Sequence, residues 1–219
     1  MAGQLILIAA SGLALEVAEA ARACGLTVRG CLDDNEALWG QDAGGWLPVL
    51  GGLDLVASFP DDSVVLCAGK GSARALIAQR LSAGGFATER YATVVHPSVT
   101  VPTSCCVGPG SVILAGCVLT ASVSLGSHVV AMPQVTMTHD NRVEDYATLC
   151  AAVTLGGYVS VAQGAYLGMG ASVRERVRIG AGGTLGMGSV LLSDLPADEV
   201  WAGVPARPLA RVSATDMGL

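Results

Sequence analysis

The chain has 219 residues, enough for one large domain or two modest ones with a buried core. Hydrophobic residues make up 52% of the chain and charged residues 14%, which excludes intrinsic disorder and indicates that much surface is buried against other subunits. The net charge of −6 and the lack of a basic run argue against a nucleic-acid-binding protein.

The composition also bears on the compartment. The first residues lack the basic segment and long apolar core of a signal peptide. The uncharged stretch from Tyr91 to His139 is punctuated by Pro, Ser, Thr and Gly, unlike a membrane span. Seven cysteines form no Cys-x-x-Cys motif, a pattern typical of reduced thiols. We therefore expect a cytoplasmic protein that does not span a membrane.

Residues 1–90 alternate between short apolar strands and helices. Strands are expected at 5–10, 27–32 and 64–68, with one helix at 13–24 and another ending near residue 83. This βαβαβ order predicts a small Rossmann-like domain whose ligand lies at the carboxyl ends of the strands.

The residues at those strand ends are the candidate acceptor-binding residues, namely Ser11, Gly12, Asp33, Asp34 and Gly69. The loop at 9–14 reads Ala-Ala-Ser-Gly-Leu-Ala instead of Gly-x-Gly-x-x-Gly, which argues against a dinucleotide oxidoreductase. In an alternative interpretation, Asp33 and Asp34 only cap the turn after their strand.

From Val95 to Leu191 every sixth residue is apolar, and the fifth position of each hexad is small or β-branched. A period of six fits neither a helix nor a regular strand, but it fits three short strands per 18-residue coil. The pattern predicts an all-β left-handed parallel β-helix over residues 91–194. Residues 195–219 form a C-terminal tail, in which Pro205 and Pro208 favour an extended path over the end of the helix.

Two of the three histidines, His128 and His139, occupy hexad positions that we expect to point outward. His139 is followed by Asp140, the first charge after the uncharged stretch. An imidazole beside a carboxylate in a groove between subunits suits general-base catalysis at neutral pH. The alternative is a His-Asp turn on the surface without a catalytic role.

Two other chemistries remain open to test. Cys150 could be a nucleophile, although a single cysteine more often packs in a core. A zinc site of the γ-carbonic-anhydrase type needs three converging histidines, and His128 and His139 are 11 residues apart, which is not a multiple of the coil. We expect no metal.

The order of these parts resembles the NeuD/PglD-type sugar O- and N-acetyltransferases of the hexapeptide-repeat acyltransferase superfamily, over nearly the whole chain. The matching motifs are Ala-Ser-Gly, Leu-Asp-Asp and Ala-Gly after the three strands, then His-Pro, His139-Asp140 and Gly-Val-Pro-Ala along the solenoid. The resemblance implies transfer of an acetyl group from acetyl-CoA to an amino or hydroxyl group of a sugar, typically nucleotide-linked, by a homotrimer.

The resemblance also implies roles for single residues. His139 would be the general base and Asp140 would raise its basicity, while a backbone amide at Gly156-Gly157, one coil above, would stabilise the oxyanion. The acetyl-CoA site would contain Thr148, Gly157, Met169 and Met187. The acceptor site would contain Ser11, Gly12, Leu13, Asp33, Asp34 and Gly69.

The chain departs from the family pattern at four positions. Thr148 stands where the family often has a second histidine, and Ala9, Leu13 and Ala14 replace the Gly, His and Gly of the nucleotide loop. The acceptor could therefore be a metabolite without a nucleotide, such as an antibiotic intermediate. A non-catalytic binding or scaffold protein on the same solenoid is the second alternative.

Overall fold

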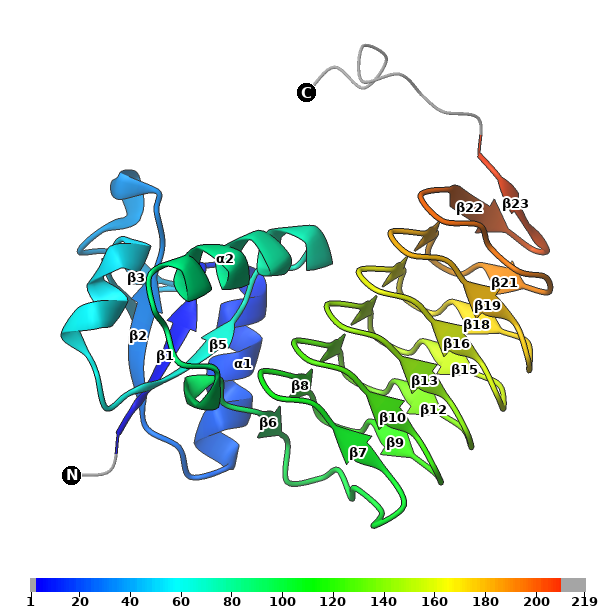
Figure 1. Cartoon of the computed structure of the whole chain (residues 1–219), viewed down its shortest axis with the longest axis horizontal. Coiled ribbons are helices and arrows are strands. Elements are labelled where there is room, and N and C mark those ends of the chain that lie inside the picture. The colour runs from blue at the N-terminus through cyan, green and yellow to red at the C-terminus, as the bar shows by residue number, and fades with distance from the viewer. Residues whose placement is uncertain (1–2, 210–219) are drawn as a thin grey trace.

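The computed structural model describes residues 3–209, in which an α/β domain is followed by a triangular column of stacked coils (Figure 1). The strands of the α/β domain are β1 (Leu5–Ile8), β2 (Val28–Leu32), β3 (Asp42–Ala43), β4 (Leu47–Gly51) and β5 (Ser63–Leu66). They form one sheet in the order β3-β4-β2-β1-β5. The helices are α1 (Gly12–Ala23) and α2 (Gly71–Ala83), with short 3-10 turns η1 (Glu36–Leu38), η2 (Leu53–Ser58) and η3 (Thr88–Arg90).

The central strand β1 explains why this domain folds as the sequence predicts. All four of its residues are buried, and it pairs in parallel with both β2 and β5. Ser11 then begins α1, since its extended backbone lets its hydroxyl accept a hydrogen bond from the amide of Ala14. The predicted Rossmann-like arrangement is confirmed. Strand β4 was not predicted, because its short Leu-Pro-Val-Leu-Gly sequence lies among glycines.

The column has three walls. Wall 1 contains β6 (Val94–Val95), β8 (Val112–Ile113), β11 (Val130–Ala131), β14 (Thr148–Leu149), β17 (Tyr166–Leu167), β20 (Thr184–Leu185), β22 (Val200–Gly203) and β23 (Ala206–Pro208). Wall 2 contains β7 (Cys106–Val107), β10 (Ser124–Leu125), β13 (Arg142–Val143), β16 (Ser160–Val161) and β19 (Arg178–Ile179). Wall 3 contains β9 (Val118–Leu119), β12 (Thr136–Met137), β15 (Thr154–Leu155), β18 (Ser172–Val173) and β21 (Val190–Leu191).

The register of the walls confirms the 18-residue coil and the left-handed β-helix. Each short strand pairs in parallel with the strand 18 residues later, as in Leu125 with Val143 and Val143 with Val161. The first hexad residues from Ile113 to Leu191 are all buried along the axis of the column. Aliphatic side chains therefore fill the interior of every closed coil.

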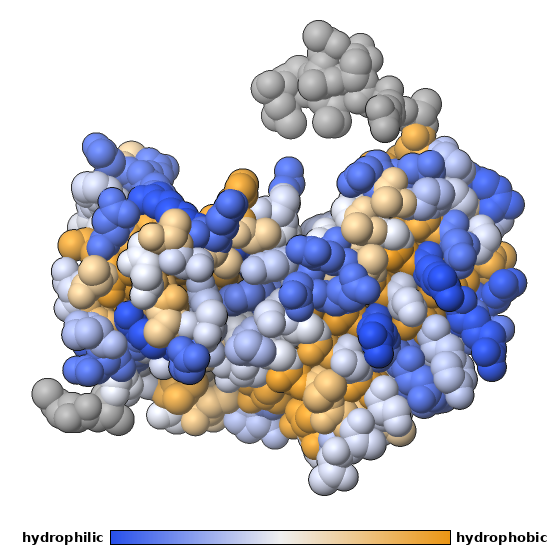
Figure 2. Space-filling model, in the orientation of Figure 1, coloured by the Kyte–Doolittle hydropathy of each residue, from blue (hydrophilic) through white to orange (hydrophobic). Residues whose placement is uncertain are grey.

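The first coil is an exception to the predicted repeat. Val101 belongs to no strand and is 36% exposed, although the hexad pattern predicts an inward position. The coil that would cover it from below is absent, so its backbone has a pairing partner on one side at most. Figure 2 shows apolar side chains near β7 at this end of the column, and more hydrophilic ones over later coils.

The end of the column is built partly by the segment predicted as a tail. Strand β22 adds to wall 1 beside β20, and β23 folds back on it in antiparallel pairing. The rest of the predicted tail, residues 210–219, lies outside the described residues. Within residues 3–209 no helix has both the length and the apolar character that a membrane crossing requires.

The α/β domain lies against the lower strands of wall 1. Val94, Val112 and Val130 point outward from this wall and share one apolar cluster with α1. Part of the uncharged stretch is thus buried within the same chain, so this part needs no other subunit to cover it.

A buried arginine joins the two parts of the chain. Arg74 of α2 is fully buried, and its guanidinium donates hydrogen bonds to both domains. Its acceptors are the carbonyl oxygens of Ala68, Gly69, His128, Tyr146 and Ala147 and the hydroxyl of Thr148, at 2.8 to 3.1 Å. Because one rigid group bonds to both sides, the orientation of the α/β domain on wall 1 is defined by these contacts.

Candidate functional site

His139 lies at the corner where wall 3 turns into wall 2, between β12 and β13. Its Nδ1 is 2.8 Å from Oδ2 of Asp140. Asp140 reaches back to the ring because its backbone has a positive φ of 60°, which the tight turn requires and which Asp tolerates better than most residues. The side chain of His139 is 56% exposed, so the ring is open to a ligand.

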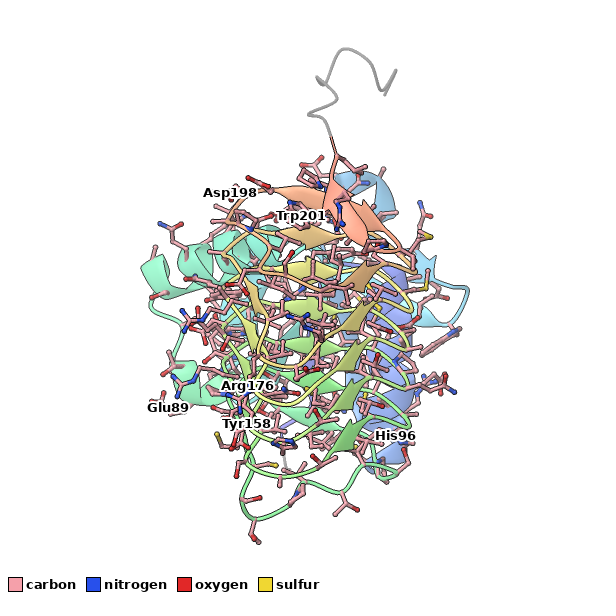
Figure 3. All side chains as sticks on the ribbon, turned by 90° about the vertical axis from the view of Figure 1, so that its right-hand side faces the viewer. Glu89, His96, Tyr158, Arg176, Asp198 and Trp201 are labelled. Atoms are coloured by element: carbon pink, nitrogen blue, oxygen red, sulfur yellow. The ribbon has the colours of Figure 1, made fainter. Side chains whose placement is uncertain are left out.

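The coil above shapes the space around the imidazole. A Cβ atom on Gly157 would lie 2.6 Å from both Cε1 and Nε2 of His139, so only glycine leaves room for the ring there. The ring of Tyr158 stands at 87° to the imidazole with a centroid distance of 5.2 Å. Arg176, another coil higher, lies over Tyr158 at 4.6 Å, and Figure 3 shows the two side by side.

This arrangement assigns different roles to the two ring nitrogens. A carboxylate only accepts hydrogen bonds, so Asp140 holds the proton on Nδ1. Nε2 then carries a lone pair, and this nitrogen lies beside Gly157 at the exposed corner. The geometry suits abstraction of a proton by Nε2. Sequence reasoning missed Tyr158, although its place 19 residues after His139, one coil and one residue on, could have indicated the contact.

Met169 and Met187 lie at a different corner, where wall 1 turns into wall 3. They are 54% and 73% exposed and line a mostly apolar cavity of about 360 Å³. Met132, Cys150 and Tyr166 contribute to the same cavity. One chain therefore does not bring the two methionines next to His139.

Thr148 cannot play the predicted role at this cavity. Its side chain is fully buried beneath the α/β domain, where the hydroxyl accepts from Arg74 and donates to the carbonyl oxygen of Gly69. No surface of it remains for acetyl-CoA to touch. The expectation that Thr148 binds acetyl-CoA is corrected accordingly.

Cys150 is poorly suited to act as a nucleophile. Only 2% of it is exposed, and burial raises the pKa of its thiol. A raised pKa lowers the thiolate fraction at neutral pH, and the thiolate is the reactive form. The packing interpretation of Cys150 is the one that the structure supports.

His128 is buried, contrary to the expectation that it points to solvent. It does point away from the column, but the α/β domain covers it and leaves 5% exposed. Its ring is stacked on Tyr146 at 5.1 Å and meets Tyr91 edge-on at 4.5 Å. Burial, helped by the charge of Arg74, lowers the pKa of His128 to about 4.

Two of the predicted acceptor residues near β1 line a small cavity. Ser11 and Gly12 line a space of about 180 Å³ together with Leu15 and Leu38. The Ser11 hydroxyl donates to the carbonyl oxygen of Cys67 at 2.6 Å. Leu13 does not face this cavity, because its side chain is buried in the core of the domain.

Asp33 and Asp34 hold the loops at the strand ends. Asp33 accepts hydrogen bonds from the amides of Ala10 and Asn35, both at 2.8 Å. Asp34 accepts from the amide of Leu53 and pairs with Arg80. The structure therefore supports the turn-capping interpretation of these two carboxylates.

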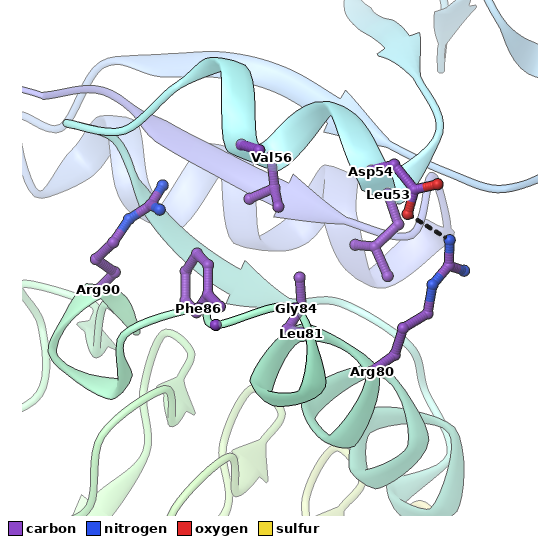
Figure 4. A pocket seen from close by; sticks show the side chains of 10 residues that line it. Leu53, Asp54, Val56, Arg80, Leu81, Gly84, Phe86 and Arg90 are labelled. Atoms are coloured by element: carbon purple, nitrogen blue, oxygen red, sulfur yellow. Dashed lines mark hydrogen bonds and ion pairs between the residues drawn. The ribbon is translucent and has the colours of Figure 1, made fainter.

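Arg80 also binds Asp54 at 2.8 Å, beside a cavity of about 280 Å³ between η2 and α2 (Figure 4). Gly69, the last predicted acceptor residue, offers its carbonyl oxygen to Arg74 and Thr148. It therefore contributes to the junction between the domains. Across residues 3–209, no three His, Cys, Asp or Glu side chains gather in a group that could hold a metal ion.

Comparison with known proteins agrees with this architecture. The family model for the PglD N-terminal domain matches residues 4–81. A GDP-perosamine N-acetyltransferase of Escherichia coli O157:H7 is 31% identical over 124 residues, which cover 54% of this chain and 56% of that protein. The matches to the first curated relatives span between 30% and 56% of the lengths of those proteins.

Solved structures match over nearly the full length. PerB from Caulobacter crescentus, in complex with CoA and GDP-perosamine, has a TM-score of 0.87 and 30% identity, covering 96% of this chain and 99% of that one. The acetyltransferase domain of PglB from Neisseria gonorrhoeae, in complex with acetyl coenzyme A, has a TM-score of 0.83 and 30% identity, covering 94% and 98%. The chain belongs to the NeuD/PglD-type sugar acetyltransferases of the hexapeptide-repeat superfamily.

Proposed function

We propose that the protein transfers an acetyl group from acetyl-CoA to an amino or hydroxyl group of a sugar, most simply a nucleotide-linked sugar. The observation that carries the proposal is the exposed His139 held by Asp140 against Gly157, in a chain whose relatives bind CoA and GDP-perosamine. His139 and Asp140 also fit a related acyl-CoA donor, since neither residue selects for the length of the acyl chain.

In the proposed reaction, Nε2 of His139 removes the proton from the acceptor nitrogen or oxygen as that atom attacks the thioester carbonyl. The carbon–sulfur bond then breaks, and the sulfur of CoA leaves with a proton returned by the imidazolium. Asp140 keeps the proton on Nδ1 and stabilises the positive charge that His139 carries during the step. The backbone amide of Gly157 stabilises the oxyanion.

The active form is proposed to be a homotrimer. The outward residues of the wall 3 strands carry no charge: Val118, Thr136, Thr154, Ser172 and Val190. Wall 2 presents Arg142 and Arg178, and the α/β domain covers part of wall 1. Wall 3 is therefore the surface best suited to face a threefold axis.

Packing of wall 3 against two further copies would also complete the site. The two corners of wall 3 carry His139 at one and Met169 and Met187 at the other. Around a threefold axis, the His139 corner of one copy meets the methionine corner of the next. The apolar cavity there would receive the pantetheine arm of the CoA substrate, so that each site takes residues from two copies.

The acceptor is the least constrained part of the proposal. A nucleotide sugar is favoured by the relatives, whereas Leu13 and the engaged Asp33 and Asp34 leave few free polar groups at the predicted acceptor site. A small acceptor without a nucleotide is thus the second candidate. We propose the cytoplasm as the site of action, where acetyl-CoA and nucleotide sugars are made.

The experiment is a thiol-release assay with acetyl-CoA and a panel of amino sugars linked to GDP, UDP or dTDP. We expect His139→Ala to lower kcat by at least about a hundredfold while CoA binding is retained. Cys106→Ser, an exposed position on β7 of wall 2, serves as the control and should leave kcat unchanged. A His139→Ala enzyme within a few-fold of wild type would exclude His139 as the base.

A further inference from the structure

A polar side chain lies inside the column directly below the proposed oxyanion site. Asn141 follows Asp140, occupies an inward fifth position and is 1% exposed. Its Nδ2 donates to the carbonyl oxygen of Gly156 in the next coil at 2.7 Å, whereas its Oδ1 is buried without a partner. An unpaired buried carbonyl is unfavourable, so this residue needs an explanation other than packing.

The bond to Gly156 determines where the next amide points. In a trans peptide the carbonyl oxygen and the following N–H point in opposite directions. The peptide between Gly156 and Gly157 is trans, and its oxygen is directed inward at Asn141. The N–H of Gly157 therefore points outward, toward the corner that holds His139, and it donates to no acceptor within residues 3–209.

Another corner of the same column shows what an outward amide of this kind binds. Ser111, also at a fifth position, donates through Oγ to the carbonyl oxygen of Gly126 at 2.9 Å, 15 residues later, as Asn141 does to Gly156. The following amide, that of Ser127, donates to a carboxylate oxygen of Asp145 at 2.7 Å. The matching arrangement thus already presents an N–H to a negatively charged oxygen.

The Gly156 turn lacks a backbone bond that closes several turns at other corners, and the turns Thr138–Asn141 and Arg174–Val177 at the same corner lack it too. At Cys150–Val153 and Ala162–Ala165, the fifth-position amide bonds directly to the carbonyl oxygen three residues earlier, at 3.2 Å in both. No such bond forms between Val159 and Gly156. At the Gly156 turn the side-chain amide of Asn141 donates to this carbonyl oxygen from inside the column.

We propose that Asn141 is a positioning residue that orients the Gly157 N–H as the donor to the thioester oxyanion. This inference rests on the proposed acetyl transfer and adds a residue that touches neither substrate. The sequence does not indicate this role, because the side chain of Asn141 lies inside the column whereas the N–H that it orients lies at the surface.

Three variants test the proposal by acetyl-CoA thiol release with GDP-perosamine, and without acceptor to follow slow hydrolysis. Asn141→Val matches the residue type at many fifth positions, so its melting temperature should equal or exceed that of wild type. Its kcat should nevertheless fall about ten- to a hundredfold, with KM for acetyl-CoA and the pH profile unchanged. Asn141→Ser can form the bond that Ser111 forms and should recover most of the rate.

Ser111→Ala removes the equivalent bond at the other corner and should leave kcat unchanged. If Asn141→Val turns over within twofold of wild type while His139→Ala is inactive, the role of Asn141 is refuted and the proposed function stands. If His139→Ala is as active as wild type, or wild type releases no thiol with any acceptor of the panel above, the proposed function fails. A crystal structure of Asn141→Val tests separately whether Asn141 orients the Gly157 N–H. An N–H in the same position as in wild type would refute this role.

Discussion

Replacing Arg74 by alanine should loosen the α/β domain from wall 1. Six hydrogen bonds at 2.8 to 3.1 Å, made by the five N–H groups of the guanidinium, disappear, and at about 1 kcal/mol for each N–H they represent about 5 to 6 kcal/mol. Burial lowers the pKa of Arg74 to about 10, which corresponds to about 3 kcal/mol spent on keeping the charge away from water. The expected net loss for Arg74→Ala is therefore about 3 kcal/mol.

Urea unfolding followed by circular dichroism, at one fixed protein concentration, measures this loss. Arg74→Lys should fall between alanine and wild type, because an ammonium has three donors for six acceptors. Arg80→Ala is the control on the same helix, since its exposed pairs with Asp34 and Asp54 are worth less than about 1 kcal/mol. A loss for Arg74→Ala no larger than that for Arg80→Ala would refute the reasoning.

Three further predictions concern other parts of the chain. The folded pKa of His128 is about 4, below its unfolded value, so between these values the unfolded state binds one more proton than the folded state. The free energy of unfolding should therefore fall by about 3 kcal/mol from pH 6.5 to pH 4. In urea titrations His128→Gln should flatten this pH dependence, and an equally steep curve for the variant would contradict the prediction. Gly157→Ala should displace the His139 ring and lower kcat about a hundredfold without unfolding the protein, and an unchanged kcat would show that the ring has room. Thr154→Arg on wall 3 should give monomers by sedimentation velocity, whereas Ser160→Arg on wall 2 should stay trimeric; trimers from both would exclude wall 3 as the interface.

The repeat made most of the column predictable, because each inward position depends only on its place within a coil. Leu125, Val143 and Val161 stack as the period of six requires. The place within a coil no longer predicts burial where a residue has something other than a neighbouring coil beside it. Val101 has no coil beneath it, and His128 faces outward from the column into the α/β domain.

The candidate site was predictable where it depends on local spacing. The neighbouring residues His139 and Asp140 form the expected hydrogen bond, and Gly157, one coil later, lies against the ring. Contacts between the α/β domain and the column could not be predicted from local spacing in the sequence. Gly69 matches the family pattern, and Thr148 occupies the position of a family histidine, but both accept hydrogen bonds from Arg74. Nothing in the sequence around Arg74 distinguishes it from an ordinary exposed helix residue.

Mixed trimers test most directly the central claim that each active site takes His139 from one copy and the methionine corner from the next. Two tagged subunits, His139→Ala and the double variant Met169→Glu/Met187→Glu, are inactive alone in this account. Co-expressed and purified through both tags in turn, each mixed trimer should contain one intact site of its three, giving about a third of the wild-type rate of acetyl-CoA-dependent thiol release. No activity in the mixed trimers would contradict a site shared between copies.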